Sequence, residues 1–261
     1  MKKKLRLKIF WIELSPENCP VRNNLNLLSQ INSGILIWIN PKKLSTYLYK
    51  LIQEGEHRQQ DFKYCINDSK KIAKSLVAFA NTDGGRLLIG VKDNGKIAGI
   101  KTEEEFYMVE AAARIYSRPA INFTTRQWNT EGKTVLEVII DPSSSKPHFA
   151  KDENGKWLAY YRINDENCLA HKIQVNVWKK QKSPSGVFIS YSDEEKFLIQ
   201  LLQKFPAISF SKYLRLSRLP RSAAEKILTD FILMEIVNMN VTKNGTTFSL
   251  NKNFNDEELL K

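Results

Sequence analysis

The segment Ser75–Ile100, SLVAFANTDGGRLLIGVKDNGKIAGI, decides the fold class of this 261-residue chain. It opens within a run, Ser69–Asn81, whose apolar residues recur at helical spacing, and Gly84-Gly85 marks the end of the predicted helix. Arg86–Asp93 then predicts a strand, and Asn94-Gly95 predicts a tight turn into a returning strand that ends at Ile100. A helix followed at once by a hairpin indicates an α+β domain.

Further helices and strands are predicted on both sides of this segment. Before it, Ser45 is a suitable N-cap for a helix through Ile52, and Gln59–Ile66 has the composition of a strand. After it, the sequence predicts a helix at Thr102–Tyr116 that begins with a capping box. A hairpin (Ile121–Trp128 with Lys133–Ile140), a strand (Trp157–Ile163) and a closing helix (Leu169–Trp178) are expected to follow. Residues 45–180 are therefore predicted to form one α+β domain, a mixed sheet with helices.

A second, smaller module is predicted over residues 188–252, between a basic and Pro/Ser-containing linker at 181–187 and a tail at 253–261. Ser192 and Glu195 form a capping box for its first helix, and Asn244-Gly245 has the sequence of a hairpin turn. Its expected elements are helices at Ser192–Phe205, Ser209–Leu216 and Arg221–Val237 and a hairpin at Val241–Leu250. Three helices and such a wing predict a winged helix-turn-helix module.

The net charge of +12 favours a polyanionic partner, but its distribution weakens that inference. Residues 1–44 carry eight basic and two acidic side chains, which is half of the net charge in a segment with no clear periodicity. We expect this segment to be a peripheral extension. Local clusters of basic residues, rather than the overall charge, must therefore identify a nucleic-acid surface.

The cysteines and the longest apolar run indicate in which part of the cell the protein is expected. Cys19, Cys65 and Cys168 are odd in number and lack metal-ligand spacing, which is typical of a reducing cytoplasm. The apolar run Gly34–Ile39 is far shorter than the ~20 residues of a membrane-spanning helix. A cytoplasmic protein without a membrane partner is expected.

Two short patterns could carry chemistry in the α+β domain. Gly90–Lys96 fits most of the phosphate-loop pattern G-x-x-x-x-G-K, but Ile97 stands where Ser or Thr would hold Mg²⁺, and a strand follows instead of a helix. A hairpin turn is the better interpretation. The second pattern places Glu56, Asp61 and Lys63 at the start of a strand, where alternation puts Asp61 and Lys63 on one face.

Asp93, at the end of the neighbouring predicted strand, could add a third carboxylate to Glu56 and Asp61. The three carboxylates would then bind Mg²⁺ or Mn²⁺, unless Lys63 neutralises part of the cluster. The alternative is that these residues form the solvated face of an edge strand.

The combination E-x-x-x-x-D-F-K at Glu56–Lys63 with the segment Ser75–Ile100 closely resembles the Schlafen AlbA-type domain, over roughly Glu54–Trp178. The resemblance implies a DNA-binding or transcription-regulator role as in bacterial members, and some members are described as ATP-binding. Some animal Schlafens are endoribonucleases that cut transfer and ribosomal RNA with three carboxylates.

Those carboxylates match Glu56, Asp61 and Asp93, although Asp61 stands where the nucleases have Glu. The active nucleases clamp RNA between two similar lobes. This chain shows one such lobe, so a homodimer would have to supply the second.

The predicted C-terminal module carries a local basic cluster over Ser211–Lys226. Five cations face one carboxylate, Glu225, in this stretch: Lys212, Arg215, Arg218, Arg221 and Lys226. A helix-turn-helix reader places phosphate-contacting cations around its turn. The alternative is a protein-docking module with a solvated basic face.

The sequence thus predicts a nucleic-acid-binding protein that needs no cofactor to bind DNA or RNA. Its proposed contacts are Lys63, Lys212, Arg215, Arg218 and Arg221. A metal-dependent endoribonuclease, with Mg or Mn held by the three carboxylates, is the first alternative. An ATP-binding switch protein is the weaker one.

Overall fold

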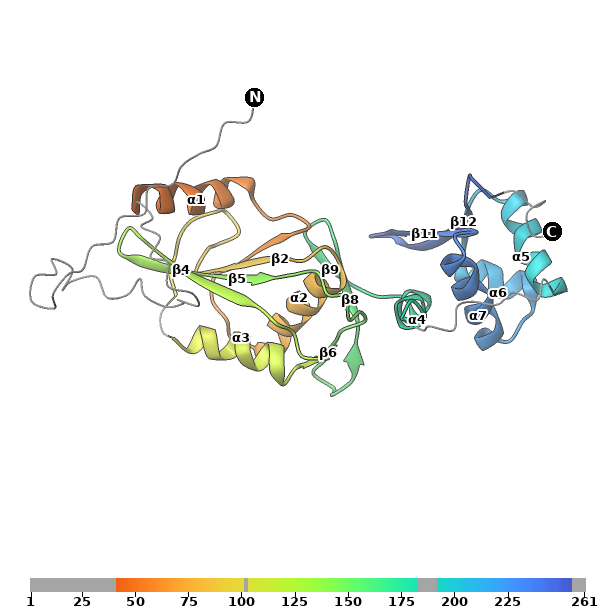
Figure 1. Ribbon diagram of the computed structural model, residues 1–261, viewed down its shortest axis with the longest axis horizontal. Coiled ribbons are helices and arrows are strands. Elements are labelled where there is room, and N and C mark those ends of the chain that lie inside the picture. The colour runs from red at the N-terminus through yellow and green to blue at the C-terminus, as the bar shows by residue number, and fades with distance from the viewer. Residues whose placement is uncertain (1–40, 101–102, 183–191, 255–261) are drawn as a thin grey trace, which may run out of the picture. The chain divides into compact units, whose positions relative to one another are not determined.

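The computed structural model describes residues 41–100, 103–182 and 192–254, with side chains from residue 46 onward (Figure 1). Most of the predicted N-terminal extension (1–44), linker (181–187) and tail (253–261) lies outside these residues, as does Thr102. Among the described residues, no helix is long and apolar enough to span a membrane.

A four-stranded sheet forms the centre of the α+β part, in the order β1-β2-β5-β4. Two of the predicted strands, β1 (Gln60–Lys63) and β2 (Gly85–Ile89), pair in parallel, which is usual for neighbouring strands joined by a helix. β5 (Lys133–Ile140) pairs antiparallel with β2 and with β4 (Thr124–Thr130). The mixed sheet predicted from the sequence is confirmed.

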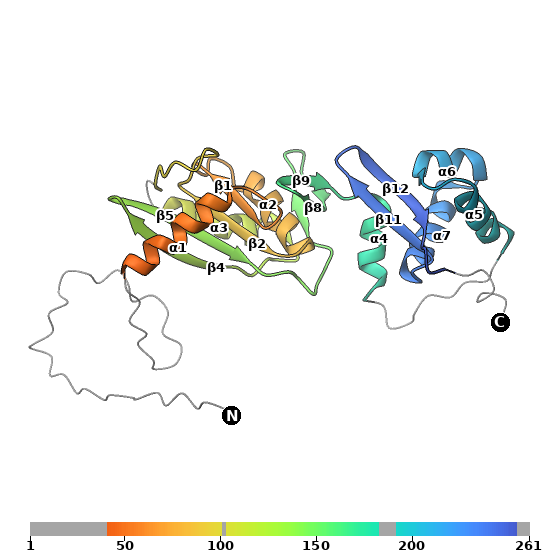
Figure 2. The same cartoon turned by 90° about the horizontal axis from the view of Figure 1, so that it is seen from above.

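Helices cover both faces of this sheet, with α1 (Pro41–Glu54) on one side and α2 (Ser69–Asn81) and α3 (Glu104–Arg114) on the other (Figure 1). α2 has the predicted bounds, and the carboxylate of its N-cap, Asp68, accepts a hydrogen bond from the Lys70 amide. In Figure 2, α1 crosses the strands. Each face therefore has its own apolar core.

The two cores alternate along the strands, as the pleat requires. Leu87 and Ile89 of β2 pack with α2 and α3, whereas Leu88 and Phe62 pack with Leu48 of α1. This alternation fixes the register of the sheet, because a slip by one residue would exchange the two faces.

Several predicted bounds are wrong. α1 begins at Pro41 rather than after Ser45, since proline is well accommodated in the first turn of a helix. β2 ends at Ile89, where Gly90 takes a φ of 95°, and the predicted return strand contributes one isolated bridge, Val91 to Ile97. The tight turn itself is present, because the Gly95 amide donates to the Lys92 carbonyl at 2.7 Å.

Short strands complete the α+β part. β3 (Ser117–Arg118), β6 (Phe149–Lys151) and β7 (Trp157–Leu158) form a small sheet. β8 (Tyr160–Ile163) and β9 (Glu166–Leu169) form a hairpin. The predicted strand Trp157–Ile163 is thus divided between two sheets.

The C-terminal part contains the three helices that the sequence predicted, α5 (Asp193–Lys204), α6 (Phe210–Ser217) and α7 (Arg221–Leu233), and the predicted hairpin, formed by β11 (Val237–Thr242) and β12 (Gly245–Leu250). The short strand β10 (Ile208–Ser209), which the sequence did not predict, precedes α6. The capping box of Ser192 and Glu195 is formed. α7 ends at Leu233 rather than at Val237, which begins β11 instead. Helix α4 (Lys172–Lys180) packs against α7 and adds Ile173 and Val177 to this core.

Candidate functional site

The loop before β1 and β1 itself bring Glu56 and Asp61 together, as the sequence predicted. Glu56 Oε1 accepts a hydrogen bond from the Phe62 amide at 2.8 Å, which turns its side chain back toward β1. Burial, followed by a hydrogen bond with Asp61, raises the pKa of Glu56 above its ordinary value. The two carboxyl groups therefore interact directly.

Two cations neutralise Asp61, whose residue surface is only 4% exposed. Lys63 Nζ lies 2.9 Å from Asp61 Oδ2, and the guanidinium of Arg162 lies 3.9 Å from the same oxygen. Ser75 Oγ, on α2, donates to Asp61 Oδ2 at 3.4 Å. Neutralisation by Lys63, one of the three explanations that the sequence offered for the cluster, corresponds to this ion pair.

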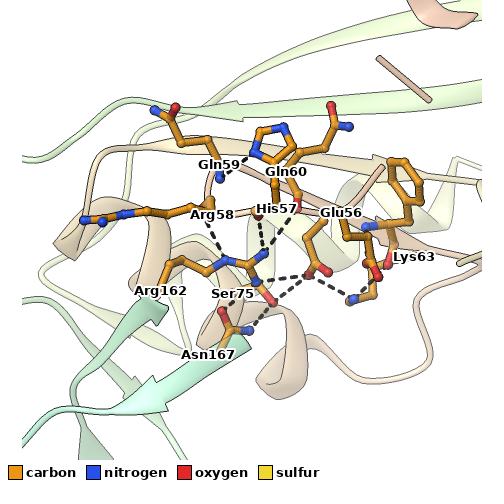
Figure 3. Close-up of polar contacts among 11 residues, drawn as sticks. Glu56, His57, Arg58, Gln59, Gln60, Lys63, Ser75, Arg162 and Asn167 are labelled. Atoms are coloured by element: carbon orange, nitrogen blue, oxygen red, sulfur yellow. Dashed lines mark hydrogen bonds and ion pairs between the residues drawn. The ribbon is translucent and has the colours of Figure 1, made fainter. Parts of the chain in front are cut away.

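Arg162 organises the loop that carries Glu56, although the sequence analysis did not single it out. Its guanidinium lies beneath the loop and donates to the carbonyl oxygens of His57 (2.9 Å), Arg58 (3.4 Å) and Gln60 (3.2 Å) (Figure 3). It also donates to Asn167 Oδ1 at 3.0 Å. One buried side chain of β8 thus holds three carbonyl groups of the loop in place.

Asn167 and Ser75 close this network. The Asn167 amide donates to Ser75 Oγ at 2.9 Å, which fixes the hydroxyl that faces Asp61 (Figure 3). The Arg162 guanidinium stacks 4.7 Å from the centre of the Phe79 ring, so one of its faces is covered. Buried charge is therefore compensated by hydrogen bonds from β1, α2, β8 and β9.

Asp93 does not join Glu56 and Asp61, so the predicted convergence of three carboxylates is not found. Parallel pairing puts Asp61 opposite Leu87, whereas Asp93 lies beyond Ile89, the last residue of β2, in an exposed turn. Among the residues that the structure describes, no three His, Cys, Asp or Glu side chains are grouped so that they could hold a metal ion. The donor set predicted for Mg²⁺ or Mn²⁺ is thus not assembled.

Lys63 and the Gly90–Lys96 turn are the other residues of the α+β part that the sequence analysis considered. The Lys63 ammonium group pairs with Asp61 and donates to the Phe62 carbonyl oxygen at 2.7 Å. Because the Asp61 carboxylate already balances its charge, Lys63 attracts a phosphate less than an unpaired lysine would. Gly90–Lys96 forms a turn and a single bridge with no helix after it. A phosphate loop needs amides at a helix N-terminus, which this turn lacks.

The basic cluster of the C-terminal part surrounds the turn between α6 and α7. Arg215 and Arg218 are exposed and have no ionic partner among the described residues, and Arg218 takes the left-handed conformation (φ 56°) that ends α6. Arg221, the first residue of α7, pairs with Glu225 at 2.9 Å. Lys212 Nζ lies 3.4 Å from the centre of the Phe205 ring. We call Arg215, Arg218 and Arg221 the turn arginines.

Comparison with known proteins identifies the α+β part. Residues 56–170 match the family model described as Schlafen, AlbA_2, and this segment is a Schlafen AlbA_2-type domain. The match contains the Glu56–Lys63 loop, the fold-deciding segment and Arg162, and it ends before α4. No curated protein matches the chain.

Two solved structures are similar to parts of the chain. The DIP2311 protein from Corynebacterium diphtheriae shares 14% identity over 80% of this chain, which spans 39% of that structure, with a TM-score of 0.42. The N-terminal domain of a RecG-related protein from Nitrosomonas europaea shares 22% identity with this chain, with a TM-score of 0.36. The similarity covers 48% of this chain and 95% of that domain.

Proposed function

We propose that this protein binds nucleic acid, and that duplex DNA is held by the C-terminal part acting as a winged helix-turn-helix. The observation that carries the proposal is the exposure of Arg215 and Arg218 at the turn between α6 and α7, with no carboxylate paired to either among the described residues. Unpaired guanidinium groups are suited to phosphate, which they contact in a bidentate manner.

The order of elements supports this role. A helix, a short strand, two helices and a hairpin follow one another from α5 to β12, and β10 pairs with the middle of β12. In helix-turn-helix readers the second helix of the motif enters the major groove, and its first residues reach base edges or phosphates. α7 would take that position in the proposed module, and it begins with Arg221 and Ser222, which are both exposed.

The AlbA_2-type domain supports a nucleic-acid role through its family, but its carboxylate cluster favours binding over cleavage. Asp61 is already neutralised by Lys63 and Arg162, and Asp93 lies elsewhere. A metal-dependent nuclease needs carboxylate oxygens that are free to coordinate its ions. Binding is therefore the first candidate function and endoribonuclease activity the second.

The decisive experiment compares two charge-matched variants of the full chain. Fluorescence anisotropy would measure affinity for a labelled DNA duplex, a single-stranded RNA and a transfer RNA over a range of salt concentrations. Arg215→Ala/Arg218→Ala should weaken duplex binding and reduce the slope of log K against log salt by up to ~0.9 for each phosphate that the variant no longer binds. Arg126→Ala/Lys156→Ala, which removes two exposed cations of the α+β part, should change both quantities much less.

Three outcomes would count against the proposal. Equal decreases in affinity for the two double variants would mean that overall charge, not the α6–α7 turn, attracts the nucleic acid. Unchanged affinity and slope in Arg215→Ala/Arg218→Ala would assign the C-terminal part to protein docking. Shortening of the RNA with Mg²⁺ or Mn²⁺, blocked by a chelator, would establish the nuclease alternative.

A further inference from the structure

A cavity of about 420 Å³ lies in the AlbA_2-type domain, away from the carboxylate cluster. Two segments supply most of its wall, residues 119–124 after β3 and residues 141–145 after β5. Its lining is largely apolar or neutral and includes Ile121, Phe123 and Thr124. Besides His148, Asp141 is the one ionisable residue among those that line it. A small uncharged group suits such a wall better than a phosphate.

His148 is buried in this wall, with 4% of its surface exposed, and its two ring nitrogens have different partners. Nδ1 lies 3.0 Å from the Pro119 carbonyl oxygen, which can only accept a hydrogen bond, so Nδ1 carries the hydrogen. Nε2 is then the unprotonated nitrogen of the neutral ring, and it lies 2.7 Å from Ser143 Oγ. The serine hydroxyl must therefore donate to His148.

Ser143 is held for this contact from several sides. Its amide donates to the Ala80 carbonyl at 2.9 Å, and its Oγ accepts a hydrogen bond from the Ser145 amide at 2.9 Å. On the other side, the His148 amide donates to Asn81 Oδ1 at 2.8 Å. The backbone of both residues is thus anchored to the C-terminal turn of α2, and the half-buried Ser143 lines the cavity.

We propose that Ser143 is a nucleophile activated by His148 and that the cavity binds a small neutral acyl ester. A serine hydroxyl, an imidazole that accepts its proton and a third group that fixes the tautomer are the parts of a serine acyl-transfer site, with the Pro119 carbonyl here in the orienting position. Ser143 Oγ forms a bond to the ester carbon while the ester C–O bond breaks. His148 Nε2 takes the Oγ proton and delivers it to the leaving alcohol.

The competing explanation is that the pair only ties the 141–148 loop to the domain. A structural hydrogen bond would leave Ser143 no more reactive than any other serine, whereas general-base assistance raises reactivity by ~10²–10⁴-fold. Reactivity toward a serine-directed electrophile therefore separates the two explanations.

The test treats the full chain with a fluorophosphonate probe, in which Oγ bonds to phosphorus, the P–F bond breaks, fluoride leaves and the proton passes to Nε2. Peptide mapping by mass spectrometry should find the probe on Ser143, and Ser143→Ala should abolish labelling. Ser211→Ala is the control, because this exposed serine of α6 does not line the cavity, and the variant should be labelled like the wild type. Added p-nitrophenyl acetate should slow the labelling, since it competes for the same oxygen.

His148→Gln should slow labelling at least ~100-fold, with circular dichroism as the check on folding. If that variant does not fold, the pH profile of the wild type decides. Burial first, and then the nearby ammonium groups of Lys182 and Lys146, lower the pKa of His148 below its ordinary 6.5, while the hydrogen bond to Pro119 opposes them. Labelling should thus persist below pH 6.5 and fall only as Nε2 becomes protonated.

The proposal would be overturned if Ser143 were labelled no faster in the folded chain than in the urea-unfolded chain. It would also be overturned by a probe spread equally over Ser144 and Ser145, by labelling that p-nitrophenyl acetate does not slow, or by a rate that stays constant as the pH falls from 8 to 4.

Discussion

Arg162 and Asp61, 101 positions apart in the sequence, lie 3.9 Å from each other with nearly all of both side chains buried. Arg162 belongs to β8 and Asp61 to β1, which are not strands of the same sheet. The guanidinium therefore joins the central sheet to the β8–β9 hairpin and at the same time holds the Glu56 loop. This double role makes Arg162 a structural centre of this part of the domain.

We predict that Arg162→Met lowers the free energy of unfolding by about 3–5 kcal/mol, because it leaves a buried carboxylate short of a cation and three loop carbonyl groups without their donor. Urea unfolding followed by circular dichroism would measure this decrease. Arg58→Ala is the control. It removes an exposed ion pair with Asp83 at 2.8 Å, and it should cost at most about 1 kcal/mol. Equal effects of the two changes would show that Arg162 is not a structural centre.

The sequence predicted the elements of the fold better than this contact, for physical reasons. Helix α2 carries its own signals, with apolar residues at helical spacing and Gly84-Gly85 after its end, so its bounds were predicted correctly. Strands β1 and β2 were also expected to be neighbours, which their pairing confirms, although their parallel orientation was not predicted. Arg162 gives no such signal, because an arginine in YYRI is as compatible with an exposed strand face as with a buried one.

The misplaced Asp93 shows a second limit of local pattern. The strand residues Arg86–Ile89 and the turn at Asn94-Gly95 were recognised, but the end of the strand was placed at Asp93 instead of Ile89. The carboxylate consequently falls in the turn, away from Asp61. Strand ends depend on hydrogen bonds to neighbouring strands, which short-range sequence does not specify.

The raised pKa of Glu56 predicts a particular dependence of stability on pH. A carboxyl group with a higher pKa in the folded state stabilises the fold fully below its ordinary pKa, here 4.5, and that contribution is lost as the pH rises through the raised value. Glu56→Gln keeps an oxygen for the Phe62 amide and a donor for Asp61 without the charge. The variant should therefore be more stable than the wild type at pH 7, with a difference that disappears below pH 4.5.

Thermal unfolding at a series of pH values would measure this difference. Glu54→Gln, which alters an exposed glutamate at the end of α1, serves as the control and should follow the wild-type curve. Lower stability of Glu56→Gln than of the wild type at pH 7 would mean that the charged form of Glu56 is the one favoured in the fold.

For Asp93→Asn we predict unchanged affinity for RNA and DNA and unchanged stability, because Asp93 lies in an exposed turn outside the carboxylate cluster. The wild type and the variant would be incubated with transfer RNA in Mg²⁺, in Mn²⁺ and in chelator, and the RNA analysed on a denaturing gel. We expect intact RNA in every lane. Metal-dependent cleavage by the wild type that is absent in Asp93→Asn would restore the three-carboxylate site.

The ion pair between Arg221 and Glu225 predicts a variant that binds more tightly than the wild type. The Glu225 side chain is 14% exposed and accepts from Arg221 Nε at 2.9 Å, so the carboxylate holds one of the three turn arginines and repels phosphate. Glu225→Gln removes that charge at a cost in stability of only about 0.3–0.5 kcal/mol. Duplex affinity should rise, and the salt slope should steepen by up to ~0.9 if the released Arg221 binds one phosphate.

A double-mutant cycle makes this last prediction specific. In the Arg221→Ala background, Glu225→Gln should raise affinity much less, because no guanidinium remains to be released. Glu110→Gln on α3 removes one exposed carboxylate from the other part of the chain and controls for net charge. If Glu110→Gln raises affinity as much as Glu225→Gln, or if the effect of Glu225→Gln is the same with and without Arg221, then the start of α7 does not contact the phosphate backbone.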